Sequence, residues 1–154
     1  MHRCALRAAG LLPAAWLGVL LCVALIATPA GFALLPRSQA GALAGHILGQ
    51  EAYLSLAIAV LLLLLDRWLA RQQTAGGPAR ALGRGSLLPL GAIFCTLLGY
   101  FALQEPMAVA RAGQGHFTFE QLHGLSLVAY ALKVGLVAAL AWRGAGGRTT
   151  PTSS

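Results

Sequence analysis

Two ionisable side chains stand inside long apolar stretches of this chain, where charge is rare. Glu51 directly precedes an uncharged run over residues 52–65, and Lys133 lies inside the apolar stretch 119–142. An ionisable group in such a place usually faces other protein groups, and it marks a functional site by default. The pair is therefore either a structural ion pair that holds two helices in register or a binding or proton-handling site, and both interpretations stay open.

Other polar side chains follow this pair at helical spacing. Ser126 and Tyr130 share a stripe with Lys133, and Tyr100 falls late in the preceding apolar stretch. Because a polar side chain that faces lipid is costly, these stripes should face one another inside a helix bundle. We therefore predict a polar, outward-facing pocket between the second, third and fourth apolar stretches. Its candidate residues are Glu51, Lys133, His123, Tyr130, Ser126, Gln50 and Tyr100.

Two histidines and a glycine run suggest further sites. His46 and His123 lie at similar depths in their stretches, and two histidines on facing helices can ligate a haem. We expect no cofactor and no metal, and keep a haem- or metal-binding redox protein as an alternative. Gly41, Gly45 and Gly49 form a GxxxGxxxG run that lets a second helix approach closely. The partner helix belongs either to the same chain or to a second copy, which would make a homo-oligomer.

The composition places these groups in a membrane. Hydrophobic residues make up 58% of the chain and the mean hydropathy is +0.73. Charged residues make up 10%, against about 25% in soluble domains, which excludes a water-soluble globule and a disordered chain. The net charge of +7 does not indicate nucleic acid, because the arginines lie at the ends of apolar runs. No catalytic or nucleotide-binding motif is present, so we expect no enzyme.

Four apolar stretches can each supply the roughly 20 helical residues that cross a bilayer. They cover residues 11–35, 41–65, 87–103 and 119–142. We predict an all-α, four-helix transmembrane bundle as a single domain over residues 1–143, followed by a disordered cytoplasmic tail over residues 144–154. A cleaved signal peptide is the competing interpretation of the first stretch. Its 25 uncharged residues exceed the usual h-region of about 7–15, so we expect it to be retained.

The cations beside these stretches predict their orientation. Eight arginines flank the side that carries both termini, whereas only Arg37 and Arg111 flank the other. Cytoplasmic loops carry the excess of cations, so both termini should be cytoplasmic in a multi-pass protein of the cell (inner) membrane, with the lipid bilayer as its partner. Trp16, Trp68 and Trp142 fall near the cytoplasmic ends, where indoles anchor at the interface.

The connection before the fourth apolar stretch contains residues that are typical of helix starts and helix ends. Thr118 and Gln121 have the spacing of a capping box, which starts a helix. Upstream, Pro106 is expected to open a short helix through Arg111, and the glycines from Gly113 onward are expected to end it.

Two regions of the chain together resemble a known family. They are AGALAGHILGQEAYLSLA at 40–57 and GYFALQEPM at 99–107, the latter followed by Arg111 and by FEQLHGLS at 119–126. These regions are similar to small bacterial four-helix membrane proteins of unknown function, related to the transmembrane protein 205-like family. The most specific elements are the LHG run at 122–124 with Ser126, and Pro106 followed by Arg111; His46 matches no family feature. The resemblance implies an inner-membrane protein of this topology and no reaction.

These observations predict a non-enzymatic membrane component with a structural or accessory role. The alternative is a small transporter or exporter component for a cation or small solute. In that case Glu51 would be the charge-bearing ligand and Lys133 its counter-ion, with His123 and Tyr130 lining the path.

Overall fold

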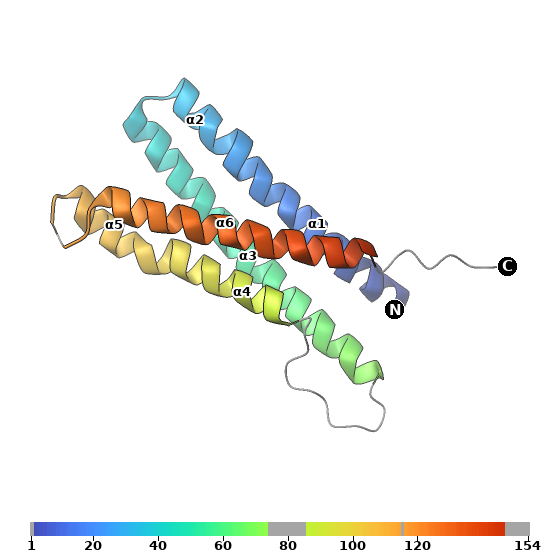
Figure 1. The fold of residues 1–154 in the computed structure, drawn as a ribbon. Coiled ribbons are helices and arrows are strands. Elements are labelled where there is room, and N and C mark those ends of the chain that lie inside the picture. The colour runs from blue at the N-terminus through green and yellow to red at the C-terminus, as the bar shows by residue number, and fades with distance from the viewer. Residues whose placement is uncertain (1, 74–85, 115, 147–154) are drawn as a thin grey trace.

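The computed structural model describes residues 2–73, 86–114 and 116–146, and this part of the chain contains helices and no strand (Figure 1). The helices form four long rods that follow one another along the chain. In chain order the elements are α1 (His2–Cys22), η1 (Val23–Ala27), α2 (Thr28–Leu34), α3 (Arg37–Gln73), α4 (Leu87–Thr96), η2 (Leu97–Ala102), α5 (Leu103–Arg111) and α6 (Phe119–Gly146).

Each rod is long and apolar enough to cross a membrane, which confirms the predicted all-α class with four spans. The candidate spans are Ala9–Leu34, Arg37–Gln72, Leu87–Arg111 and Phe119–Ala145. The third is longer than expected because its helix continues through the polar residues after Leu103. α6 continues to Gly146, so residues 144–146 belong to this helix and not to the predicted tail. The rest of that tail lies outside the described residues.

Two of the rods widen into a short π-helical segment before a proline. η1 precedes Pro29, and η2 precedes Pro106. A proline inside a helix donates no hydrogen bond, and its ring crowds the carbonyl four residues earlier, which here is Leu25 or Ala102. The π-helical segments accommodate this defect without breaking the rod. The prediction that Pro106 opens a separate helix is therefore wrong, because the backbone stays helical from α4 through α5.

The four rods form a bundle in which α1 and α4 each pack against both α3 and α6. α3 and α6 lie diagonally opposite and do not pack directly against each other over the described residues. The start of α1 and the end of α6 meet at one end of the bundle, where a Cβ on Gly144 would lie 3.3 Å from the Gly10 backbone. We call this the terminal end, and we call the opposite end, which holds the α2–α3 and α5–α6 connections, the hairpin end (Figure 1).

The bundle is held together differently at its two ends. Toward the terminal end a buried apolar cluster joins all four rods; its buried members are Trp16, Leu20, Ala59, Leu62, Ala92 and Val137. Toward the hairpin end, α2 packs on α3 and α5 packs on α6, but in the described chain these two hairpins do not pack against each other. They diverge in Figure 1. The hairpin end is therefore the more open end of the bundle.

The connection into α6 has the local structure that its sequence predicts. Gly113 adopts a left-handed φ of +70° just after α5 ends, as expected for a helix-terminating glycine. Thr118 and Gln121 form the capping box: the Thr118 amide donates to Gln121 Oε1 over 3.1 Å, and the Gln121 amide donates to Thr118 Oγ1 over 3.3 Å. These bonds satisfy amides that a helix start leaves unpaired.

We predict that Thr118→Ala lowers the free energy of unfolding by about 1 kcal/mol, because one orphan amide of α6 loses its acceptor. The measurement is equilibrium unfolding of the protein in detergent micelles, with the loss of helix followed by circular dichroism. Thr118→Ser is the matched control, since it keeps the hydroxyl and should stay close to the wild type. Equal losses in the two variants would show that the hydroxyl does not cap the helix.

Candidate functional site

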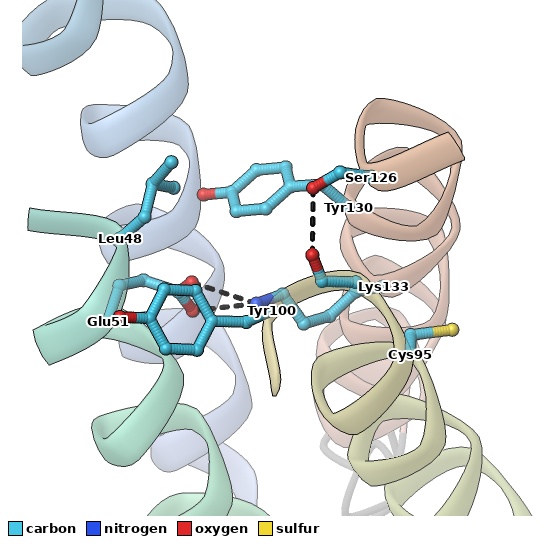
Figure 2. Close-up of a pocket in the computed structure, with 8 residues that line it drawn as sticks. Leu48, Glu51, Cys95, Tyr100, Ser126, Tyr130 and Lys133 are labelled. Carbon is cyan, nitrogen blue, oxygen red and sulfur yellow. Dashed lines mark hydrogen bonds and ion pairs between the residues drawn. The ribbon is translucent and has the colours of Figure 1, made fainter. Parts of the chain in front are cut away.

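An ion pair at the centre of the bundle connects the two diagonal helices. Lys133 of α6 donates to both carboxylate oxygens of Glu51 on α3, over 2.8 and 2.9 Å (Figure 2). Both residues are buried, with 5% of Glu51 and 3% of Lys133 exposed. α3 and α6 share no direct packing over their described lengths, so this contact spans the bundle between them. The long lysine side chain makes that reach possible.

The Glu51 carboxylate is also tied to the first rod. Ser55, one turn further along α3, donates its hydroxyl hydrogen bond to Glu51 Oε1. Trp16 of α1 in turn donates from Nε1 to the Ser55 hydroxyl over 2.9 Å. Trp16 is 1% exposed, so the expectation that it anchors at the membrane interface is wrong. Its indole instead completes a buried chain of hydrogen bonds.

Tyr130 closes the site on the α1 side. Its ring lies 4.7 Å from Lys133 Nζ, within the range of a cation–π contact. Its hydroxyl donates to the Leu20 carbonyl of α1 over 2.9 Å. Because the hydroxyl is held in this way, the ring face stays turned toward the ammonium group.

A small hollow lies beside the ion pair. Its volume is about 30 Å³, which is room for about one water-sized group. Its walls come from α3, α4, η2 and α6, and its lining residues are Leu48, Glu51, Cys95, Gly99, Tyr100, Ser126, Tyr130 and Lys133 (Figure 2). On α3, Leu48 lies nearer the hairpin end than Glu51, and on α6, Ser126 lies nearer that end than Lys133. The hollow therefore extends from the ion pair toward the hairpin end.

Two close contacts shape the hairpin side of this hollow. Ser126 donates its hydroxyl hydrogen bond to the Gly99 carbonyl over 2.8 Å. A Cβ on Gly99 would lie 2.9 Å from the Ala129 Cβ, so α6 and η2 approach closely there. Across the hollow the Tyr100 hydroxyl lies directly against Gly49 of α3, where any Cβ would collide with it.

Five of the seven predicted pocket residues line the hollow, namely Glu51, Lys133, Tyr130, Ser126 and Tyr100. Gln50 and His123 do not line it, and both are exposed. Gln50 directly precedes Glu51, so its side chain is turned by about 100° around the helix and is exposed. His123 lies near the start of α6, where the helix hairpins diverge.

The site also includes residues that sequence analysis missed. Ser55 lies one turn from Glu51, and this spacing places both on one helix face. Leu48, Cys95 and Gly99 look like ordinary apolar or small residues of a span, so nothing in their types marks them. Trp16 lies in a different rod, and only the three-dimensional packing brings it to Ser55.

The two predicted histidines each contact a residue of their own helix. His46 Nε2 lies 3.2 Å from the Gln50 amide nitrogen one turn along α3. His123 stacks on Phe119 at 5.6 Å between ring centroids. No group of three or more His, Cys, Asp or Glu side chains suited to a metal occurs in the described chain. The haem alternative remains an untested prediction.

Within the described chain, one of the three glycines of the GxxxGxxxG run is covered by a neighbouring side chain. Gly49 receives Tyr100, whereas a Cβ on Gly41 or Gly45 would meet nothing within 4 Å in the described chain. The predicted packing face is therefore not filled by another helix of the same chain at these two positions.

The two predicted motif residues of the α5–α6 connection differ in their roles. Pro106 lies inside α5. The Arg111 guanidinium lies 4.9 Å from the centroid of the Phe119 ring, so it ties the end of α5 to the start of α6.

A family model matches residues 11–116 and is described as a domain of unknown function, DUF4149. The chain belongs to the DUF4149 family. This result confirms the expectation of an uncharacterised family. The match includes Glu51, Cys95 and Tyr100 but ends before α6, so Lys133 lies outside it. The comparisons with curated proteins and with solved structures found no match.

Proposed function

We propose that this DUF4149 protein is a non-enzymatic, multi-pass membrane component with a structural or accessory role. The observation that carries this proposal is the bidentate Glu51–Lys133 contact, which is braced by Ser55 and by Trp16. A carboxylate bound in this way is satisfied by the protein itself. With Lys133 in place, the hollow beside it has room for about one water-sized group, which supports a packed bundle rather than an open path for a larger solute.

The proposal also includes an orientation of the protein in the membrane and a relationship to a second protein family. The excess of arginines around the terminal end supports cytoplasmic termini in the inner membrane of a bacterium, with the hollow open to the outer side. A C-terminal fusion to a reporter that is active only in the cytoplasm tests this orientation, and an inactive fusion would reverse it. The residues at 40–57 and 99–107 support kinship with the transmembrane protein 205-like family.

A flux assay tests the accessory role against the transporter alternative. The purified protein is reconstituted into vesicles loaded with a pH-sensitive dye or with a sodium- or potassium-sensitive dye. We expect no flux above that of protein-free vesicles, for either the wild type or Glu51→Gln. Wild-type flux that disappears in Glu51→Gln would overturn the accessory role and favour transport through the charged site.

We also propose that Gly41 and Gly45 pack against a second copy of the chain. Both belong to a GxxxG pattern, and neither is covered within the described chain. Gly45→Leu should therefore convert a dimer to a monomer in light-scattering measurements in mild detergent, with little change in monomer stability. Gly124→Leu is the matched control, because Gly124 also has no neighbour within 4 Å of its added Cβ. A wild type that is already monomeric would refute this interface.

A further inference from the structure

The Lys133 ammonium group lies among groups that would bind any primary ammonium ion. Two carboxylate oxygens of Glu51 accept its hydrogen bonds, and the Tyr130 ring presents its face at 4.7 Å. Carboxylates form strong charge-assisted hydrogen bonds with ammonium groups, and an aromatic face attracts a cation electrostatically. We call Glu51 and Tyr130 the ammonium cage. All three of these contacts are made with the ammonium head of the lysine.

The cage adjoins the hollow on its hairpin side. The hollow of about 30 Å³ adjoins it toward the hairpin end, where the two helix hairpins diverge (Figure 1). Ser126 lines this hollow, and its hydroxyl keeps acceptor lone pairs after donating to the Gly99 carbonyl. On the other side the cage is closed by α1, through Trp16 and through the Tyr130–Leu20 hydrogen bond.

We infer that the ammonium cage is a binding site for a small primary ammonium ion, which enters from the hairpin end and competes there with the Lys133 side chain. The lysine head sits on a flexible four-carbon stem, so it can act as a tethered occupant that a free ammonium ion replaces. This site is an addition to the structural role and does not depend on it. Failure of the ammonium site would leave the structural proposal intact.

Chemical rescue of Lys133→Ala tests the inference. The substitution removes three methylene groups and the ammonium, and n-propylammonium restores the same atoms. The melting temperature of the variant in detergent should be well below that of the wild type. It should rise with n-propylammonium concentration, logarithmically once the concentration exceeds the dissociation constant, as binding linkage requires.

Two controls separate recognition of the charge from simple filling of space. n-Propanol has nearly the same shape and no charge, so it should give little rescue. In Glu51→Gln/Lys133→Ala the cage lacks its carboxylate, and n-propylammonium should then have no effect. Absence of rescue in Lys133→Ala, or equal rescue by n-propanol, would overturn the inference.

A second measurement on the native site applies even where Lys133→Ala fails to fold. Cys95 lines the hollow, whereas Ala92, one turn nearer the terminal end, is fully buried and does not line it. In a Cys4→Ser/Cys22→Ser background, 2-aminoethyl methanethiosulfonate carries a primary ammonium to the thiol. Cys95 should be labelled faster than the cysteine in Ala92→Cys/Cys95→Ser, and n-propylammonium should slow the Cys95 reaction. Equal labelling at both positions would refute entry through the hollow.

Discussion

Replacing Lys133 with methionine is expected to lower the free energy of unfolding by about 3–5 kcal/mol, because Glu51 would remain buried without a counter-charge. The Glu51 carboxylate lies in the centre of the bundle and receives both of its charged hydrogen bonds from Lys133. Ser55 offers one neutral hydrogen bond, which does not balance a full charge. Equilibrium unfolding in mixed detergent micelles, followed by circular dichroism, measures the loss.

The double variant Glu51→Gln/Lys133→Met is the control for this result. It has no buried charge, and replacing a buried ion pair with uncharged residues of similar size is often neutral or stabilising. It should therefore recover much of the loss, with a coupling free energy of at least about 1 kcal/mol. Losses that simply add in the double variant would mean that the two residues act independently, and the structural role of the pair would then be lost.

Gly99→Ala is expected to lower the free energy of unfolding by about 1–2 kcal/mol, since the strain of overpacking exceeds the gain in helix propensity. The new Cβ would lie 2.9 Å from the Ala129 Cβ. Neither atom can rotate away, because both are attached directly to helix backbones. The result would be a wider spacing between η2 and α6, and this would also disturb the hydrogen bond from Ser126 to the Gly99 carbonyl.

Two further variants test the Gly99 prediction by the same unfolding assay. The exchange Gly99→Ala/Ala129→Gly moves the methyl group from α6 to η2 and should restore most of the stability. Gly135→Ala adds a methyl group where nothing lies within 4 Å, so it should be neutral or stabilising. A Gly99→Ala variant as stable as Gly135→Ala would contradict the close approach of the two helices.

Sequence patterns predicted the fold class and much of the central site. Apolar length gave four spans, and the intramembrane positions of Glu51 and Lys133 marked the two residues that meet in the structure. The stripe of Ser126 and Tyr130 followed from helical periodicity alone. The capping box of Thr118 with Gln121 was also readable, because its partners are three residues apart.

The errors at Trp16 and at the glycines concern contacts between distant parts of the chain. A tryptophan near the end of a span fits an interfacial anchor, and only the packing of α1 shows that Trp16 bonds to Ser55. Glycine spacing marked Gly41, Gly45 and Gly49, of which Gly49 receives Tyr100, but it did not mark Gly99, whose partner Ala129 carries no signal in its type. Pro106 favours a helix start over a helix interior, and the π-helical widening before it accommodates it inside the rod.

The π-helical segment η2 has a consequence for chain length among relatives. Widening a helix in this way accommodates an extra residue, so the residues beyond it are turned by about 100° relative to an uninterrupted α-helix. Arg111 lies beyond η2 and reaches Phe119, whereas Cys95 lies before it and faces the hollow. A relative that kept both contacts with a regular helix would need one residue fewer between these positions. Insertions and deletions here should therefore come as single residues, inherited together with the presence or absence of the proline at 106.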